Sequence, residues 1–257
     1  MFKKWQLRKF EKRKREEDPN LTRLKVLGDP FLLASYEDIL NFQISLFEFL
    51  ELPIKIVEFG SAGGITKLRY PDVVTTDIRH GDGIDCLLNK DFTLPFEDSS
   101  LSGIMAKDVL HHISNPESHF FEIKRVLKNG GVAIYAEPNW NLVSKVVFTF
   151  FHPEPFIQKQ LPWKFESHDP MYSNQALPYI IFVRDADLFK KRFPEFEVEV
   201  LEKTFNGLSF LLSGGVMQRT FIPSRILLAI KKIESKSSFL MIRFGTIRMI
   251  KIKKIGV

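Results

Sequence analysis

Cysteine is almost absent from this chain, because Cys86 is the only one among its 257 residues. A single thiol cannot form a disulfide within the chain, and it cannot build a metal centre from several cysteines. Disulfides persist in oxidising compartments and are rare in the cytosol. The composition therefore favours a reducing environment, and we expect a cytoplasmic protein.

Long apolar runs are also missing. The longest, such as 146–151 and 226–230, fall far short of the roughly 20 residues that span a bilayer. The first ten residues are charged throughout and lack the apolar segment of a secretory signal, so we expect no signal peptide. A length of 257 residues suits one α/β domain with additional elements better than two full domains.

Acidic residues are scarce at both ends of the chain. Residues 1–15 carry eight Lys/Arg and one Glu, a net +7, and residues 219–257 carry ten Lys/Arg and one Glu, a net +9. Because the whole chain is +6, these two ends leave −10 for residues 16–218. Basic ends on an acidic body suit anionic partners, namely a membrane surface, a phosphorylated lipid or nucleic acid.

The basic ends have two interpretations. Trp5, Leu7 and Phe10 lie among the first charges, as in helices that bind a membrane interface. Each Lys or Arg near an anionic leaflet contributes about 1 kcal/mol, so a handful would attach the protein peripherally to the inner membrane face. The alternative is a flexible arm whose charges are solvated. The interpretation that the partner is a nucleic acid rests on the basic ends alone, and we do not expect such a partner.

Along the middle of the chain, short apolar segments are separated by stretches that are long enough to form a helix. This alternation predicts an α/β fold with a parallel sheet and right-handed crossovers. A helix is expected over 30–52, where Pro53 ends it, and the clearest amphipathic helix covers 120–127. The expected strands are 55–59, 73–76, 103–106, 131–136 and 196–205, with a weaker one over 83–88 and another within 241–255.

The pattern divides the chain into an extension and a domain. Residues 1–52 form the extension, which begins with a basic helical arm over 1–20, and residues 53–257 form the domain. Within the domain, 138–215 is rich in proline and aromatic residues, and we interpret it as an insertion that covers the active site like a lid. Its aromatic residues suit stacking on sugars or a lipid chain, although a plain lid core is the favoured interpretation. The basic strand region is 219–257.

A glycine turn follows directly after the first of these strands. The strand carries Glu58, and Gly60, Gly63 and Gly64 come next, so the backbone can turn tightly and approach a ligand closely. Asp77 ends the following strand, where a carboxylate can accept hydrogen bonds from a ribose. The arrangement predicts a pocket for a nucleoside cofactor, with an ordinary strand-to-helix turn as the alternative.

Further motifs follow in order: Leu-Pro-Phe at 94–96, Asp-Ser-Ser-Leu at 98–101, Asp-Val-Leu-His-His-Ile at 108–113 and Arg-Val-Leu-Lys-Asn-Gly-Gly at 125–131. With the glycine turn, they resemble the class I S-adenosylmethionine-dependent methyltransferases, close to the type 11 group. The resemblance covers about 54–138. It implies a Rossmann-like, seven-stranded, mostly parallel sheet with an antiparallel last strand and helices on both faces. It also implies an S-adenosylmethionine cofactor over the glycine turn.

The resemblance also implies roles for single residues. Glu58 and Gly60 would face the methionine end of the cofactor, and Asp77 would take the ribose hydroxyls. Asp91 is the expected acid on the adenine side, with Asn89 as the alternative. The remaining cofactor-binding candidates are Ser61, Gly63 and Asp108. The helix expected at 65–70 is shorter than in most relatives, which would leave the cofactor pocket more open on that side.

His111 and His112 are the candidate catalytic residues, because a histidine titrates near neutral pH and can take a proton from an acceptor hydroxyl. The alternative is that one packs beneath the cofactor while the other faces solvent. Glu137, just past the next strand, and His152 are further candidates, and a structural role for Glu137 is equally favoured. Orienting the two reactants can supply roughly 7–11 kcal/mol, so positioning is expected to account for much of the rate.

No metal site is expected, because no two histidines lie four residues apart beside a carboxylate. Asp82 and Asp85 with Asp77 offer Mg²⁺ ligands, but solvated loop acids are the favoured interpretation. The chain also lacks the Asn/Asp-Pro-Pro-Tyr string that accompanies amino-group methylation of DNA bases.

The acceptor is less defined by the sequence. Segments at 152–156, 174–178, 182–185 and 212–215 are similar to methyltransferases that accompany surface-polysaccharide biosynthesis. We therefore expect methyl transfer to a hydroxyl of a small or lipid-linked acceptor, such as a surface-glycan precursor. The alternatives are C- or O-methylation of a lipid-soluble quinone-type ring, a non-catalytic cofactor-binding scaffold with membrane-associating basic ends, and methylation of RNA.

Overall fold

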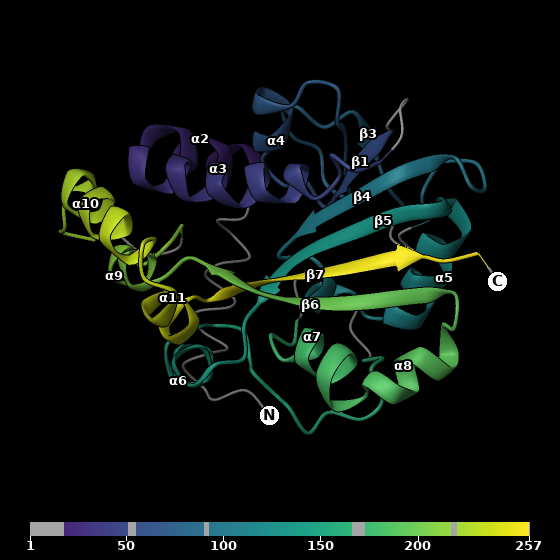
Figure 1. Cartoon of the computed structure of the whole chain (residues 1–257). Coiled ribbons are helices and arrows are strands. Elements are labelled where there is room, and N and C mark those ends of the chain that lie inside the picture. The colour runs from purple at the N-terminus through teal and green to yellow at the C-terminus, as the bar shows by residue number, and fades with distance from the viewer. Residues whose placement is uncertain (1–17, 51–54, 90–92, 166–172, 217–219, 257) are drawn as a thin grey trace.

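The computed structural model describes residues 18–50, 55–89, 93–165, 173–216 and 220–256. Seven strands form one sheet in the order β3-β2-β1-β4-β5-β7-β6 (Figure 1). Neighbouring strands are parallel except in the two pairs that involve β7, which runs antiparallel to both β5 and β6. This arrangement confirms the predicted Rossmann-like sheet with its last strand reversed.

The strands follow the apolar pattern of the sequence. The strand predicted over 196–205 has those bounds, whereas β5 begins before residue 131 and the weak strand over 83–88 shrinks to two residues. β5 begins early because Leu127 pairs with Leu101 ahead of a register shift in the ladder. The bounds are β1 Ile56–Phe59, β2 Val74–Asp77, β3 Cys86–Leu87, β4 Leu101–Lys107, β5 Leu127–Pro138, β6 Phe196–Phe205 and β7 Ile247–Lys254.

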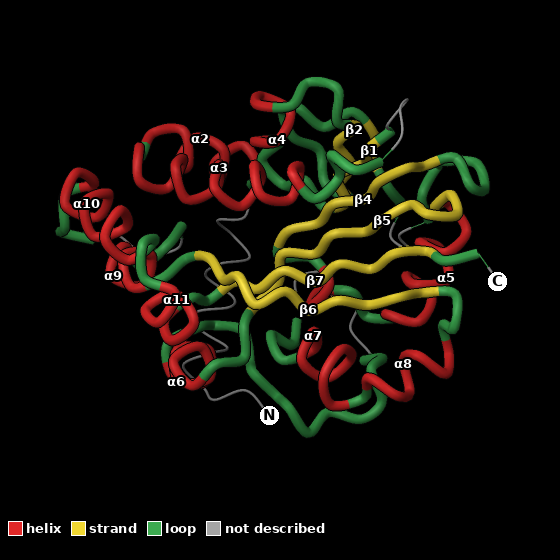
Figure 2. The backbone as a smooth tube through the Cα atoms, in the orientation of Figure 1, coloured by secondary structure: helices red, strands yellow, loops and turns green. Residues whose placement is uncertain are grey.

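Helices cover both faces of this sheet (Figure 2). Among the described residues, none of them is both long enough and apolar enough to cross a bilayer. Their bounds are α2 Pro19–Gly28, α3 Pro30–Ser45, α4 Ile65–Arg69, η1 Leu110–His112, α5 Pro116–Val126, α6 Leu142–Phe150, α7 Leu177–Tyr179, η2 Ile180–Arg184, α8 Ala186–Arg192, α9 Leu208–Ser213, α10 Ser224–Glu234 and α11 Ser238–Phe244.

Two apolar cores lie against the two faces of the sheet. Successive strand residues alternate between them: Ile104 of β4 joins one core, and Met105 joins the other. The first core packs α5, α7 and α8 and contains a buried aromatic cluster, Phe120, Phe182, Phe189, Phe193 and Phe196. The second core packs α2, α3 and α4. This alternation is the period of two that made the strands predictable.

Two helices of the predicted extension pack against the domain. α2 begins at Pro19, where the sequence predicts the end of the basic arm, and it is a helix that the sequence analysis missed. Residues 1–17 lie outside the described residues. α3 ends at Ser45, earlier than predicted, and Gln43 donates from Nε2 to the carbonyls of Ala106 and Ile134 at 2.9 and 3.2 Å. That side chain ties α3 to β4 and β5.

The predicted insertion at 138–215 contributes to two parts of the molecule. Its first segment contains α6 and then an irregular stretch up to residue 165, while 166–172 lie outside the described residues. Its second segment, from α7 to α8, leads into β6 and packs in the core beneath the sheet. The aromatic residues of this second segment are therefore largely core residues.

Candidate functional site

The candidate site lies at the edge of the sheet where the parallel strands β1, β2, β4 and β5 have their carboxyl ends. Residues that follow or end these strands meet at this edge because the strands run in register. The glycine turn follows β1, Asp77 ends β2, Asp108 follows β4 and Glu137 lies near the end of β5. In open α/β sheets, ligands bind at this edge.

The glycine turn needs its glycines for steric reasons. Gly60 has φ +74°, and a Cβ there would lie 2.4 Å from Cγ2 of Val109. Gly64 has φ +60°, and a Cβ there would lie 2.5 Å from the carbonyl oxygen of Asp82. L side chains avoid this backbone region, so only glycine permits so close an approach. The turn thus brings bare backbone to the end of β1.

Helix α2 closes one side of this turn. A Cβ on Gly63 would lie 3.0 Å from the backbone nitrogen of Arg23, and Arg23 Nη1 donates to the carbonyls of Gly63 and Gly64 at 2.8 and 2.9 Å. Asn20 Oδ1 accepts from the backbone nitrogen of Asp82 at 2.8 Å. The close neighbour of Gly63 is therefore α2. No sequence pattern predicted these contacts, because α2 itself was not predicted.

Glu58 carries an unsatisfied carboxylate oxygen beside the turn. Its side chain is buried, and Oε1 accepts from the Thr66 hydroxyl at 2.6 Å. No described residue donates to Oε2. Burial raises the pKa of Glu58, against the hydrogen bonds from Ser61 and Thr66, which favour the charged form. A buried acceptor without a donor suits a polar ligand group.

Asp77 holds the turn in place. Its Oδ2 accepts from the backbone nitrogen of Ala62 at 2.8 Å, and its Oδ1 accepts from the backbone nitrogen of Arg79 at 2.9 Å. Ser61 joins the same arrangement, since its backbone nitrogen donates to the Thr76 carbonyl at 2.8 Å. Asp91 lies outside the described residues, and its alternative Asn89 is exposed after β3.

Asp108 forms an ion pair with its neighbour Lys107. Burial alone would raise the pKa of Asp108, but the charge and hydrogen bond of Lys107, together with the nearby His111 and His152, outweigh it and hold that pKa below its usual range. The Lys107 ammonium also lies 4.2 Å from the ring centroid of Tyr36 on α3. Asp108 has φ +55°, in a region that L residues rarely adopt, so the chain is strained where it leaves β4.

His111 and Glu137 form a buried hydrogen-bonded pair. His111 Nδ1 lies 2.7 Å from Glu137 Oε2, while Glu137 Oε1 accepts from the backbone nitrogens of Val109 and Leu110 at 3.0 and 2.8 Å. A carboxylate only accepts, so the network places an imidazole hydrogen on Nδ1. The carboxylate thereby fixes the orientation of the ring.

Three histidines gather around a second buried glutamate, Glu154, and we call these four residues the histidine cluster. Glu154 oxygens lie 3.7 Å from His111 Nε2, 3.8 Å from His112 Nε2 and 3.8 Å from His152 Nδ1. Gln175 also donates to Glu154. No sequence pattern pointed to Glu154, because this residue follows the pair of histidines only after β5 and α6.

The histidine cluster also offers metal ligands. One ligand atom from each of His111, His112 and Glu154 lies within 4.8 Å of the other two. Two imidazoles and a carboxylate form a donor set used by zinc enzymes. The spacing rule that predicted no metal considered neighbours in sequence, and it could not detect a ligand set assembled from separate loops.

The predicted residues thus form two groups at one edge. Glu58, Gly60, Ser61, Gly63 and Asp77 surround the glycine turn. Asp108, His111, His112, Glu137 and His152 lie at or beside the histidine cluster. The two groups meet where Val109 packs against Gly60.

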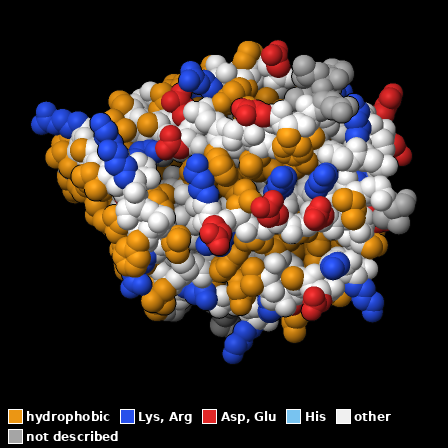
Figure 3. All heavy atoms as spheres, viewed as in Figure 1, with side chains coloured by type: hydrophobic (Ala, Val, Ile, Leu, Met, Phe, Trp, Pro, Cys, Tyr) orange, Lys and Arg blue, Asp and Glu red, His pale blue; other side chains and the backbone are white. Residues whose placement is uncertain are grey.

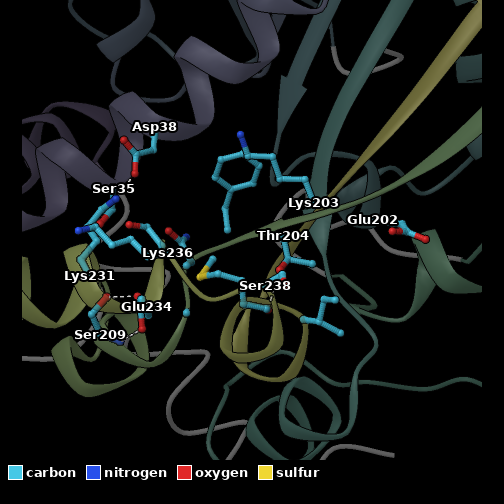
Figure 4. A pocket seen from close by; sticks show the side chains of 16 residues that line it. Ser35, Asp38, Glu202, Lys203, Thr204, Ser209, Lys231, Glu234, Lys236 and Ser238 are labelled. Atoms are coloured by element: carbon cyan, nitrogen blue, oxygen red, sulfur yellow. Dashed lines mark hydrogen bonds and ion pairs between the residues drawn. The ribbon is translucent and has the colours of Figure 1, made fainter.

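A separate pocket of about 730 Å³ lies between α3, the end of β6 and the helices α9 to α11 (Figure 4). Its lining contains Lys203, Lys231 and Lys236 as well as acidic side chains. Two of these acids are engaged: Asp38 pairs with Lys231, and Glu234 accepts from Ser209. None of the residues predicted from the sequence lines this pocket.

Residues 69–135 match a family described as a methyltransferase domain. An uncharacterized 37.1 kDa protein in transposon TN4556 of Streptomyces fradiae is 39% identical over 49 residues, which cover 19% of this chain. That match spans only 14% of the length of the Streptomyces protein.

Two solved structures resemble the chain in fold. One is a chain from a complex between the Haloferax volcanii Trm112 methyltransferase activator and a protein described as a methyltransferase. Its TM-score is 0.51 at 14% identity, over 94% of this chain and 99% of that one. The other is Haemonchus contortus phosphoethanolamine N-methyltransferase 2 in complex with phosphomonomethylethanolamine and S-adenosylhomocysteine. Its TM-score is 0.50 at 13% identity, over 85% of this chain and 53% of that one.

Proposed function

We propose that this chain, which carries a class I S-adenosylmethionine-dependent methyltransferase domain, methylates a hydroxyl of a small or lipid-linked acceptor. S-adenosylmethionine is the cofactor of this domain. The acceptor chemistry rests on one observation, the buried hydrogen bond between Glu137 and His111 Nδ1. We propose that Nε2 of His111, which lies 3.7 Å from Glu154 Oε2, takes the proton of an acceptor hydroxyl.

The residues around the glycine turn fit the cofactor. Gly60 and Gly64 bring bare backbone to the end of β1, and Oε2 of Glu58 has no donor among the described residues. We assign the methionine end of the cofactor to Glu58, Gly60 and Ser61, and the ribose hydroxyls to Asp77. Asp91, with Asn89 as the alternative, remains the proposed contact on the adenine side.

The chain's own residues handle the acceptor proton. When bound, the cofactor supplies a methyl group activated by a sulfonium. Nε2 of His111 would take the proton of the acceptor hydroxyl during methyl transfer. The Glu137 carboxylate, which holds Nδ1, stabilises the imidazolium that results. His112 and Glu154 line the same cluster and position the acceptor.

The first experiment separates donor binding from turnover. Calorimetry with S-adenosylhomocysteine should show binding to the full chain and a loss of affinity of at least about tenfold in Asp77→Ala, since a ribose loses a hydrogen-bonded carboxylate. No binding by the wild type, or unchanged affinity in the variant, would refute the cofactor site.

The second experiment tests the base. Turnover is followed as S-adenosylhomocysteine release with a panel of lipid-linked sugars, quinols and RNA. His111→Asn should lower kcat by about 10²–10⁴-fold and leave donor affinity unchanged, whereas His80→Asn, at an exposed histidine, should behave as the wild type. Equal turnover in His111→Asn and the wild type would eliminate His111 as the base.

The same panel decides among the acceptors. The likeness of 152–156 and 174–178 to methyltransferases of surface-polysaccharide biosynthesis supports a glycan precursor, and turnover of a lipid-linked sugar alone would agree with it. Turnover of quinols alone, or of RNA alone, would instead identify that molecule as the acceptor. A chain that binds the donor and turns over no acceptor would be a cofactor-binding scaffold.

The division into an extension over 1–52 and a domain over 53–257 also remains a proposal, and a cytoplasmic location remains one with it. The contacts of Arg23 with the glycine turn suggest that the extension supports the cofactor site. Removal of residues 1–52 should therefore weaken S-adenosylhomocysteine binding by calorimetry. Full affinity in the truncated chain would show that the extension is independent of the site.

A further inference from the structure

Three helices at one end of the molecule expose large apolar side chains. α6, α10 and α11 lie together at the left end in Figure 1, and contacts join α11 to both α6 and α10. Phe239 is 69% exposed, Leu142 69% and Ile233 68%. We call the following six residues the apolar end: Leu142, Val146, Phe151, Ile233, Phe239 and Ile242. Their clustering on adjacent helices sets them apart from the scattered apolar residues of an ordinary surface.

The core does not account for these side chains. α10 already buries Leu227, which packs with Phe31 and Leu32 of α3, while Ile233 points to solvent. α11 buries none of its residues completely, although it is composed mainly of apolar ones. These helices therefore have an apolar side beyond the one that the fold requires.

Positive charge surrounds the apolar end. Residues 139–153 and 220–245 contain six Lys/Arg and a single acid, Glu234. Glu234 is buried and accepts hydrogen bonds from Ser209, so it contributes little to the surface. Arg225, Lys232, Lys236 and Arg243 are exposed. In the space-filling view, hydrophobic side chains with Lys and Arg among them cover the left end of the molecule (Figure 3).

The helices are held in fixed positions. Asn141, at the start of α6, donates from Nδ2 to the carbonyls of Ile242 and Gly245 at 3.1 and 2.8 Å. Lys231 of α10 pairs with Asp38 of α3, and Ser224 donates to Asp29 at 2.9 Å. The apolar end is thus built on braced helices, and it can dock without folding first.

The chain also connects this surface to the candidate site. α6 lies between Glu137 and Glu154 in sequence, and both glutamates belong to the buried polar site. The chain from α6 to Glu154 is short, so a molecule held against α6 would lie near the histidine cluster.

We propose that the apolar end docks on an anionic membrane, with its apolar side chains in the interface and its Lys and Arg side chains against acidic headgroups. Charge complementarity identifies this occupant: apolar side chains surrounded by cations suit an anionic lipid surface, where hydrocarbon and phosphate lie side by side. The docking proposal does not depend on the proposed reaction, because it concerns membrane binding alone. Docking would place the candidate site beside a pool of lipid-linked molecules.

Vesicle flotation of the full chain tests the docking surface. Phosphatidylcholine vesicles with phosphatidylglycerol should bind the wild type, and phosphatidylcholine alone should bind it more weakly. In the double variant Phe239→Ser/Ile242→Ser, the partition coefficient should fall by at least about tenfold, because two bulky apolar side chains no longer enter hydrocarbon. Leu68→Ser/Leu87→Ser, at exposed leucines of α4 and β3, is the matched control and should bind normally.

A variant with fewer surface charges and a check that each variant is folded complete the test. Lys232→Gln/Arg243→Gln should weaken binding to anionic vesicles and reduce its dependence on salt. Calorimetry with S-adenosylhomocysteine verifies that each variant is folded. Binding by Phe239→Ser/Ile242→Ser equal to the wild type would overturn the proposal, as would binding lost only when residues 1–15 are removed. A dimer in sedimentation velocity that this variant dissociates would assign the surface to a second copy of the chain and also overturn it.

Discussion

Replacing Glu137 with glutamine changes one buried hydrogen bond and should abolish most of the base catalysis. In the wild type, Glu137 Oε1 accepts from two backbone nitrogens while Oε2 accepts from Nδ1 of His111 at 2.7 Å. A glutamine keeps the two backbone hydrogen bonds through its carbonyl and turns its amide group towards Nδ1. Since that amide can only donate, the imidazole hydrogen moves to Nε2. The acceptor hydroxyl then meets a donor instead of a lone pair.

The expected effects on rate and on stability differ in size. Loss of the base lowers kcat by about 10²–10⁴-fold, which is about 2.7–5.5 kcal/mol of activation free energy. The substitution replaces a hydrogen bond to a charged group, which stabilises the fold by about 1.5–3 kcal/mol, with a hydrogen bond between neutral groups, which stabilises it by about 0.5–1.5 kcal/mol. Removing a buried charge partly offsets that loss. The free energy of unfolding should therefore change by about 1 kcal/mol.

Three measurements on Glu137→Gln separate these effects: steady-state kinetics, calorimetry with S-adenosylhomocysteine and urea unfolding. We expect kcat to fall by two decades or more, with donor affinity and stability close to the wild type. Glu117→Gln, at a partly exposed glutamate on α5, is the control for the loss of one carboxylate. A kcat within about threefold of the wild type, less than a tenth of the expected effect, would show that Glu137 is structural and that Nε2 of His111 is not the base.

The remaining predictions concern the turn, the core and the histidine cluster. Gly60→Ala places a Cβ 2.4 Å from Val109 at φ +74°, so it should cost about 2–5 kcal/mol in urea unfolding and weaken S-adenosylhomocysteine binding. Unchanged affinity in a folded variant would refute the role of the turn. Burial lowers the pKa of His119 from 6.5 to about 3, so its native form is neutral while the unfolded chain takes up a proton below pH 6.5. Stability should therefore fall as pH drops through this window, by about 2–3 kcal/mol near pH 4.5, and His119→Gln should flatten that slope. An unaltered slope would place the proton uptake elsewhere. Finally, methyl transfer should survive chelators. Loss of activity that zinc restores would make the histidine cluster a metal centre.

Much of the fold follows from local patterns in the sequence. Strands such as 103–106 alternate between two cores with a period of two, and each helix between them needs one apolar stripe. The observed strands and helices that differ from the predicted ones do so for specific reasons. β5 starts at Leu127 because its first residue pairs with Leu101, and that pairing carries no signal in its own segment. α2 lacks the buried apolar stripe of an amphipathic helix, because its three leucines are exposed and it buries only Pro19 and Val26.

The candidate site was predictable in part for the same reason. Glu58 and Asp77 lie at the carboxyl ends of their strands and Gly60 follows one directly, so the order of elements alone brings them to one edge. Glu154 was not predictable, because its place beside His111 depends on how the loop after α6 returns to the sheet. The brace from Arg23 to the glycine turn likewise depends on tertiary packing of the extension.

A crystal structure of the chain with S-adenosylhomocysteine would test the proposed cofactor site and its relation to the histidine cluster together. We expect the ribose at Asp77, the amino group at Glu58 and the sulfur facing Nε2 of His111 across the end of β4. A nucleoside bound instead in the pocket between α3 and α10, or a sulfur directed away from the histidine cluster, would contradict this expectation.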